Sequence, residues 1–256
     1  MVIGNYEVCR KKGFFSKIFT KIFGVVDYHT HIRLKPIIEY AKSKGLYGNF
    51  LEIGCGEGII AFELNRRGHV KRYLGLDMNE NAINKAKRTK RAIGHKNVKF
   101  LHEDALSFLN TTDIKMNIDY VVLYDFIEHI HNPGKFLKKL CMCIGEKGGG
   151  KTFLVSVPTP NYPKVFGRRF HESVGHVIDG YTKKDLDKLF EKIGYKPYYY
   201  EYNTGLIGNI GAYIFYHLMP IVNIKVLFLL TMPFRILDVN SEKISSSLFV
   251  VYKKEN

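Results

Sequence analysis

Three glycines occupy every second position directly after an apolar run in "LEIGCGEGII", residues 51–60. Glycine adopts backbone conformations that are closed to other residues, and it lets a ligand approach the main chain closely. Gly54, Gly56 and Gly58 therefore predict a tight loop against which a small molecule lies. The spacing is not the G-x-G-x-x-G of dinucleotide-binding loops, which would place the third glycine where Ile59 stands.

Carboxylates accompany this loop. Glu52 lies just before the turn and Glu57 lies inside it. Both would repel a diphosphate, whereas an ammonium or a sulfonium group would be attracted. Asp77 ends the next β-rich run, 19 residues past Gly58, where an acid can accept hydrogen bonds from ribose hydroxyls. The charges therefore favour a cationic nucleoside over a nicotinamide dinucleotide.

A second group of side chains has the chemistry of a general base. Glu128 and His129 follow the run "IDYVVLYD", and "RRFHESVGH" adds His171 and His176. Imidazole and carboxylate groups can remove a proton from an oxygen or nitrogen nucleophile. We predict catalytic roles for Glu128, His129 and His171. The alternative is that Glu128 and His129 form a structural pair that orients their loop. His131 is expected to be an exposed loop residue.

Short β-rich runs alternate with helical stretches from about residue 48 onward. The expected strands are "NFLEI", "RYLGLD", "VKFLHED", "IDYVVLYD", "KTFLVSV", "KPYYYEY" and "SSSLFVVYK". Helices are expected at "GIIAFELNRRG", "NENAINKAKRTKRAIG", "NPGKFLKKLCMCIG" and "TKKDLDKLFEKIG", the last capped by Thr182. This alternation predicts an α/β fold with a doubly wound, seven-stranded, mostly parallel sheet, whose ligands bind outside the carboxyl ends of the strands.

These runs carry a resemblance to a known family. "LEIGCGEG", "LGLDM", "HEDAL" and "LYDFIEHI" resemble the successive motifs of class I S-adenosylmethionine-dependent methyltransferases, in particular the small-molecule enzymes of ubiquinone-biosynthesis type. The resemblance covers roughly residues 48–202 and the last strand. It implies S-adenosyl-L-methionine as the cofactor and methyl transfer as the reaction.

The resemblance also assigns roles to single residues. The glycine loop would face the methionine part of the cofactor, with Cys55 as a small spacer rather than a nucleophile. Asp77 would hold the ribose, Met78 would pack on the adenine, and Phe126 would help to form the floor beneath the methyl group. The residues implied to bind the cofactor are Glu52, Gly54, Cys55, Gly56, Gly58, Asp77, Met78, Asp104, Ala105, Tyr124 and Asp125.

A metal-dependent variant of this site is an open alternative. "DFIEH" resembles the E-x-x-E-H stretch of ubiquinone-type O-methyltransferases and metal-dependent RNA 2′-O-methyltransferases, whose side chains can hold a divalent metal. Here the first acid is Asp125, one carbon shorter than glutamate. Asp125, Glu128, His129 and His171 could together bind Mg²⁺ or a softer ion. We assign no metal ligand on this basis.

Two segments lie outside the strand–helix alternation. In the N-terminal arm, "KGFFSKIFTKIFG" places phenylalanines and isoleucines on one helical face and lysines on the other, which is typical of a helix at a membrane interface or of one that covers the domain. The segment "VVDYHTHIRLKP" then joins the arm to the domain and is placed to reach the acceptor pocket.

The second segment is an apolar insertion before the last strand. Residues 206–224 carry no formal charge. The strands on either side belong to one sheet, which argues against a single membrane span. A hairpin broken near Pro220 and Asn223 has arms too short to cross a bilayer. The insertion is then a cap over the active site, an interfacial anchor, or both.

The amino-acid composition limits the classes of partner that the protein can have. The 256 residues are 46% hydrophobic, enough for one large core, and carry a net charge of +15. That charge favours an anionic partner, unless it only reflects a lysine-rich proteome. The basic stretch 85–99 is either a phosphate-facing patch or a solvated helix face. Four cysteines without metal or disulfide spacing, and an N-terminus without an apolar leader, predict a cytoplasmic protein.

We therefore predict one methyltransferase domain over residues 1–256. It comprises a helical arm (1–45), a cofactor-binding core (46–203), the apolar insertion (204–244) and the last strand (245–256). The acceptor is expected to be a small or lipid-like molecule, reached from the inner face of a membrane. An RNA methyltransferase is the alternative, although no N-P-P-Y motif and no RNA-binding module is present. A cofactor-binding regulatory protein without turnover is the third.

Overall fold

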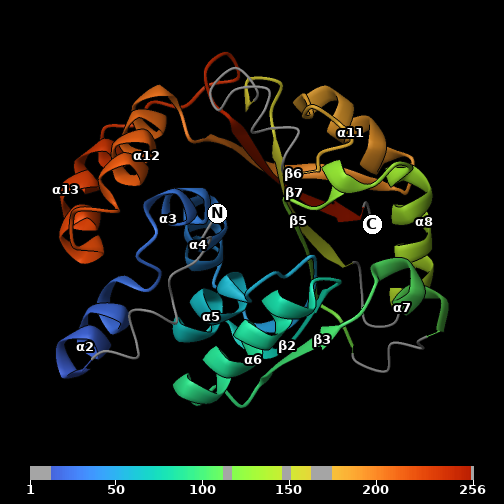
Figure 1. Ribbon diagram of the computed structural model, residues 1–256. Coiled ribbons are helices and arrows are strands. Elements are labelled where there is room, and N and C mark those ends of the chain that lie inside the picture. Colours follow the sequence, from blue (N-terminus) through green and yellow to red (C-terminus); the bar gives the residue numbers. More distant parts are fainter. Residues whose placement is uncertain (1–12, 112–116, 146–150, 163–174, 255–256) are drawn as a thin grey trace.

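One seven-stranded sheet organises the chain, of which the computed structural model describes residues 13–111, 117–145, 151–162 and 175–254 (Figure 1). The strand order is β3-β2-β1-β4-β5-β7-β6, and only β7 runs antiparallel to its neighbours. The strands are β1 (Gly48–Ile53), β2 (Val70–Asp77), β3 (Val98–His102), β4 (Tyr120–Tyr124), β5 (Thr152–Pro158), β6 (Tyr195–Asn203) and β7 (Ser247–Lys254). The predicted fold class is confirmed.

Helices cover both faces of the sheet. Successive side chains of a strand point to opposite faces, so Phe50 and Leu51 of β1 enter two separate apolar clusters. The first cluster is covered by α4 (Lys35–Ser43), α5 (Ile59–Arg66) and α6 (Glu80–Ile93). The second is covered by α7 (Ala105–Thr111), α8 (Pro133–Ile144) and α11 (Lys183–Glu191). The result is a three-layer α/β/α arrangement.

The helix ends follow local side-chain chemistry. Asn79 accepts a hydrogen bond from Ala82 N at the start of α6, and Gly94 ends that helix in the left-handed conformation. Thr182 caps α11 through Asp185 N, as its sequence predicts. The short helix α7 was not predicted. Asp104 starts it by accepting a hydrogen bond from Ser107 N at 2.8 Å.

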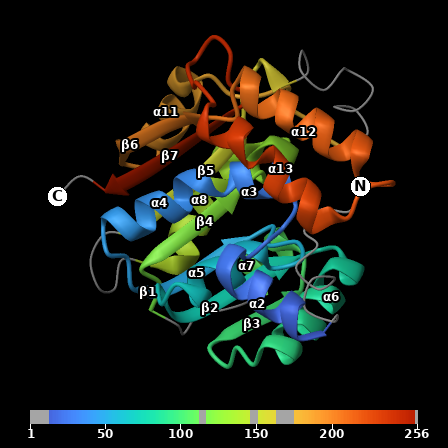
Figure 2. The same cartoon turned by 90° about the vertical axis from the view of Figure 1, so that its left-hand side faces the viewer.

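Four helices form a separate group, here called the helical cover: α2 (Gly13–Phe23), α3 (Tyr28–Arg33), α12 (Leu206–Leu218) and α13 (Ile224–Ile236). They share an apolar cluster centred on Tyr28, Phe215 and Phe228. Figure 2 shows α12 and α13 lying across α3, with α2 below them. Segments about 180 residues apart in the sequence therefore pack into one unit.

The apolar face of α2 is divided between two surroundings. Phe19 and Phe23 pack edge-on against Phe228 of α13, with ring centroids 6.3 and 6.0 Å away. Phe14, Ile18 and Ile22 remain exposed. Phe19 and Phe23 therefore cover the domain, as one of the two expectations for this helix has it, while the exposed side chains leave the membrane-interface expectation open.

The apolar insertion is a helical hairpin, as predicted. Helix α12 ends at Leu218 and α13 begins at Ile224, with the capping side chain of Asn223 between them. Each helix has 13 residues, which corresponds to roughly 20 Å. Within the described residues, none of the helices has the length and apolar character needed to span a bilayer.

Candidate cofactor and acceptor site

The predicted site residues lie where the strand order reverses, on either side of β1. After β1 the chain turns toward β2 and β3, whereas β4 and β5 lie on the other side of β1. The carboxyl ends of β1, β2, β3 and β4, here called the cofactor edge, therefore flank the reversal point, which is the preferred ligand position in such sheets.

The glycine loop at this edge needs each glycine for a different reason. All three have positive φ, at 79°, 50° and 76° for Gly54, Gly56 and Gly58. A Cβ on Gly54 would lie 2.6 Å from the ring of Phe126, and one on Gly58 would overlap the ring of Phe100. A Cβ on Gly56 would meet nothing within 4 Å. Gly56 is therefore the position at which the backbone is open to a ligand.

Asp77 ties this loop to the next helix. Its carboxylate accepts hydrogen bonds from Gly56 N at 2.7 Å and from Asn79 N at 2.8 Å. Each carboxylate oxygen can accept more than one hydrogen bond. Asp77 can therefore hold the loop and accept from ribose hydroxyls at the same time.

The two glutamates of the loop differ from the sequence-based expectation. Glu52 is buried and accepts a hydrogen bond from the Tyr73 hydroxyl at 2.7 Å. Burial raises its pKa to about 8, although the bond from Tyr73 lowers it. Glu57 pairs with Lys85 at 2.8 Å. The cofactor edge therefore does not present two free negative charges, because burial favours the neutral form of Glu52 and Lys85 already pairs with Glu57.

The remaining predicted cofactor residues lie around the same edge. Met78 is 74% exposed at the end of β2, where an adenine could pack on it. Asp104 and Ala105 lie just beyond β3, and Asp104 also caps α7. Cys55 is buried against Gly75 of β2, and burial raises the pKa of its thiol well above the ordinary value. A packed, protonated thiol fits the predicted role of a spacer.

The end of β4 carries an ion pair that the sequence did not reveal. Asp125 has a φ of 52° and its carboxylate accepts a hydrogen bond from Arg33 of α3. Burial alone would lower the pKa of Arg33, but the acidic groups around it, Asp125 first, raise it overall. The 25–36 segment therefore reaches the end of β4 through Arg33, and its approach to the acceptor stays a prediction. A buried arginine requires an acid, but the burial of Arg33 and the identity of its partner become visible only in the folded chain.

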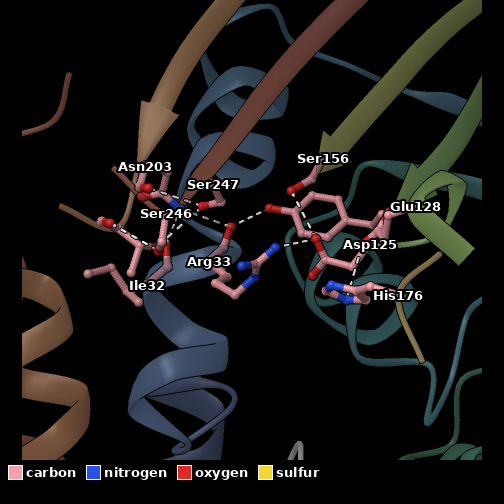
Figure 3. A network of polar contacts seen from close by, with 11 residues as sticks. Ile32, Arg33, Asp125, Glu128, Ser156, His176, Asn203, Ser246 and Ser247 are labelled. Atoms are coloured by element: carbon pink, nitrogen blue, oxygen red, sulfur yellow. Dashed lines mark hydrogen bonds and ion pairs between the residues drawn. The ribbon is translucent and has the colours of Figure 1, made fainter. Parts of the chain in front are cut away.

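Helix α3 is fastened over this edge by its last carbonyls (Figure 3). Asn203 at the end of β6 donates to Ile32 O at 2.9 Å and to Arg33 O at 3.3 Å. The hydroxyl of Tyr124, at the end of β4, also donates to Arg33 O. The final carbonyls of a helix have no partner within the helix. Asn203 and Tyr124, at the ends of two strands, are the hydrogen-bond partners of these carbonyls and so fix the position of Arg33.

Glu128 and His129 lie in the short helix η1 (Ile127–His129), directly after β4. The carboxyl of Glu128 is fully buried, and within the described part of the chain neither of its oxygens has a hydrogen-bond partner. Burial, then Asp125, raises its pKa well above the ordinary value. His129 Nδ1 lies 3.0 Å from Gly175 O. Since a carbonyl accepts, Nδ1 carries the proton and Nε2 keeps its lone pair.

His176 completes this group. Its Nε2 lies 3.9 Å from Glu128 Oε1, and its ring lies edge-on to that of His129 with centroids 4.9 Å apart. The backbone of the same segment is held by Val177 N and Ile178 N, which both donate to Glu128 O. His171 lies outside the described residues, so its catalytic role stays a prediction. His131 is exposed, as expected.

A divalent ion fits part of this group. One ligand atom each from Glu128, His129 and His176 lies within 4.8 Å of the others, and the buried carboxyl without a hydrogen bond is the kind of group that a ligand or ion satisfies. Asp125 does not join this set, because its carboxylate pairs with Arg33. One carboxylate and two imidazoles suit Zn²⁺, Mn²⁺ or Fe²⁺ better than Mg²⁺.

Comparison with known proteins points to one family. A family model described as "Methyltransferase domain" matches residues 47–192. The mitochondrial ubiquinone biosynthesis O-methyltransferase of Dictyostelium discoideum is 28% identical over 137 residues, which cover 51% of this chain and 40% of that protein. The ubiquinone biosynthesis O-methyltransferase of Aeromonas salmonicida is 27% identical over 118 residues, 45% of this chain and 46% of that protein. The match therefore spans less than half of either relative.

Solved structures share the fold. The N-methyltransferase NodS of Bradyrhizobium japonicum, in complex with S-adenosyl-L-homocysteine, is 15% identical, with a TM-score of 0.55 over 89% of this chain and 88% of that one. Magnesium protoporphyrin IX methyltransferase of Synechocystis, with the same product bound, is 12% identical, with a TM-score of 0.54 over 95% and 88%. The family model covers more than half of the chain, and the chain therefore belongs to the class I S-adenosylmethionine-dependent methyltransferases, whose cofactor is S-adenosyl-L-methionine.

Proposed function

We propose that this protein transfers a methyl group from S-adenosyl-L-methionine to a small or lipid-like acceptor, with a hydroxyl oxygen as the leading target. The observation that carries the proposal is the buried carboxyl of Glu128 beside the imidazoles of His129 and His176, directly after β4. The names of the two curated relatives, both O-methyltransferases of ubiquinone biosynthesis, support an oxygen acceptor.

The cofactor supplies an already activated methyl group on a sulfonium. The chain's residues must then hold the acceptor in line, exclude water and receive the acceptor proton. The acceptor oxygen forms the new bond to the methyl carbon as the sulfur–carbon bond breaks, and the hydroxyl proton passes to a protein base.

His129 is the proposed base. Its Nδ1 proton is committed to Gly175 O, so Nε2 is the atom that can accept a proton. Burial, then Asp125, raises the pKa of Glu128 and so favours its neutral form. Asp125 and Arg33 neutralise each other at the end of β4 and are proposed to set the shape of the acceptor side rather than to move protons.

The lipid-like nature of the acceptor rests on the helical cover. Helix α3, which delivers Arg33 to this edge, packs against the hairpin α12–α13. The hairpin exposes large apolar side chains, among them Tyr213, Ile221 and Leu230. An apolar surface next to the acceptor side suits a molecule that partitions into a membrane. Peripheral contact with the inner face of a membrane is part of this proposal.

The experiment is methyl uptake with two matched variants. Purified protein would be incubated with methyl-labelled cofactor and separate lipid, small-molecule and RNA extracts. His129→Gln is expected to lower turnover about 100-fold, the usual contribution of a general base, while calorimetric cofactor affinity stays unchanged. His131→Gln, two residues away and exposed, is the control and should keep full turnover. Equal turnover of both variants would contradict the proposed base.

The alternatives give distinct results in the same experiment. Label in RNA, with binding that weakens steeply with salt, would favour the basic helix α6 and an RNA acceptor. Cofactor binding without label in any extract would favour a regulatory protein. A metal at Glu128, His129 and His176 predicts loss of turnover in a chelator and recovery with Zn²⁺ or Mn²⁺, whereas full turnover in chelator would end that alternative.

A further inference from the structure

A hollow lies away from the cofactor edge, between α2, α4, α5 and α13. Its volume is about 220 Å³. None of the residues assigned above to cofactor or acceptor lines it. The lining divides into an apolar part, which includes Ile22, Phe23 and Met232, and a charged part that comprises Lys35, Glu63, Arg67 and Arg235.

The charged part of this hollow is short of acids. Glu63 is buried, and its Oε2 already accepts from both Arg66 at 2.9 Å and Arg67 at 2.5 Å. Among the described residues, no carboxylate lies within ion-pair distance of Lys35 or Arg235. Burial lowers the pKa of Arg235, and Glu39 is the acid that does most to raise it, through a charge interaction beyond ion-pair distance. The hollow therefore presents an excess of positive charge.

Arg235 itself is incompletely satisfied. Its Nη1 contacts His31 Nε2 at 2.8 Å, and within the described structure its buried Nε has no hydrogen-bond partner. Burial, then Arg235, lowers the pKa of His31 to about 3, so that this imidazole is neutral and adds no charge of its own. A half-buried guanidinium that keeps an unused donor is suited to binding an anion, and phosphate oxygens match its planar fork.

The surface around the hollow is apolar rather than polar. Ile22 of α2 lines the hollow and is 62% exposed, and Ile236, next to Arg235, is 76% exposed. Phe14 of α2 and Leu230 of α13 are exposed as well. Figure 2 shows α2 and α13 neighbouring each other on the side that faces the viewer. A soluble phosphate would gain nothing from these side chains, whereas a lipid offers them its acyl layer.

We propose that this hollow binds the headgroup phosphate of an anionic phospholipid, with Lys35, Arg67 and Arg235 facing the phosphate and the exposed side chains of α2 and α13 entering the membrane interface. Apolar insertion and basic attraction are the two contributions that hold a protein on an anionic membrane. The inference rests on the peripheral membrane contact of the proposed function and adds the lipid class and its site, but lipid binding here requires no methyl transfer.

Vesicle flotation tests the proposal with the full chain. Vesicles of phosphatidylcholine alone would be compared with vesicles that contain phosphatidylglycerol at about one lipid in three, as a composition with the surface potential of an anionic leaflet. The wild type should float with the anionic vesicles. The double variant Lys35→Gln/Arg235→Gln should partition about 25-fold more weakly, because each basic residue near an anionic surface contributes a factor of about five.

A charge-matched control separates the hollow from net charge. Lys184→Gln/Lys188→Gln removes the same charge from exposed positions on α11, on the opposite side of the molecule in Figure 1. It should change partitioning less than about twofold, since screening limits exposed charges to about 10 Å. Ile22→Ser/Ile236→Ser should remove the binding that persists at high salt. Thermal melting checks that all variants are folded.

The outcomes each decide the proposal. Equal loss in both charge variants would show non-specific attraction and overturn the specific site. Failure of the wild type to float would overturn it as well. Protection against melting by inorganic phosphate, without flotation, would make the ligand a soluble anion. Asp77→Ala, which impairs the predicted cofactor contact, should still float with anionic vesicles. Flotation therefore tests the lipid site even if no methyl transfer is found.

Discussion

The cofactor edge and the helical cover are built in opposite ways. At the cofactor edge, the side chains with predicted cofactor roles lie at or just after the carboxyl ends of strands, and Gly54, Gly56, Gly58 and Asp125 all have positive φ. In the helical cover, Tyr28, Phe215 and Phe228 meet from distant parts of the sequence and make an apolar cluster. The edge therefore depends on local backbone geometry, whereas the cover depends on burial between remote helices.

This difference implies that the two regions can fail separately. The edge joins the cover mainly through α3, where Asn203 and Tyr124 bind the last carbonyls and Arg33 meets Asp125. Damage to the glycine loop should remove cofactor binding from a protein that stays folded. Damage to the apolar cluster should loosen the cover around an intact cofactor site.

The largest expected effect is that of Gly56→Val. A Cβ at this position faces open space, so the added side chain would occupy the volume predicted for the cofactor. We expect cofactor affinity to fall more than about 1,000-fold, or about 4 kcal/mol, measured by calorimetry.

The matched control is Gly45→Val, at the opposite end of β1. Gly45 has a φ of 58°, and a Cβ there also meets nothing within 4 Å. Both variants carry a left-handed strain of about 1–2 kcal/mol, so they should melt alike. Normal affinity in Gly56→Val would mean that the cofactor lies elsewhere.

Phe228→Ala tests the other region. Phe228 is fully buried and touches rings from α2 and α3. Truncation of a buried phenylalanine costs about 3–5 kcal/mol. We expect hydrogen exchange to accelerate in α12 and α13, with cofactor affinity within about threefold of the wild type. Leu230→Ala, exposed on the same helix, should change neither the hydrogen exchange of α12 and α13 nor the cofactor affinity. Uniform acceleration across the sheet would show that the cover and the core unfold as one unit.

Asp77→Ala sharpens the comparison within the cofactor edge. The change removes the acceptor for Gly56 N and Asn79 N and the predicted partner of the ribose. We expect cofactor affinity to fall about 100-fold, near 2.7 kcal/mol. Asp77→Asn keeps one acceptor oxygen, and its cofactor affinity should lie between those of the wild type and Asp77→Ala. Unchanged affinity in the alanine variant would remove the ribose assignment.

The same contrast explains what the sequence could predict. The glycine spacing and Asp77 are local features of a strand end and the turn after it. The strands and the position of the cofactor edge could therefore be predicted from the sequence. The pairing of Arg33 with Asp125 joins positions 92 residues apart, and no local pattern specifies it. The charge argument about Glu52 and Glu57 failed for the same reason, because Tyr73 and Lys85 come from other elements.

The smallest expected effect concerns the protonation of Glu52. Its pKa is raised to about 8 in the folded protein, against about 4.3 in an unfolded chain. Between these values the folded state holds a proton that the unfolded state has released. The contribution to stability is therefore complete below about pH 4 and is lost as the pH rises toward 8. Wild-type stability should accordingly fall between pH 5.5 and 8 in urea unfolding.

Glu52→Gln isolates this contribution from those of other buried acids. Asp27 and Glu128 also have raised pKa values, so the wild-type slope contains more than one group. Glutamine keeps an acceptor for the Tyr73 hydroxyl but cannot titrate, and we expect the loss of stability between pH 7 and 8 to shrink by about 1 kcal/mol. Glu57→Gln, on the same loop but paired with Lys85, should leave the slope unchanged. If Glu52→Gln kept the full slope, Glu52 would already be ionised at neutral pH, and a charged carboxylate would again be available to the cofactor's ammonium group.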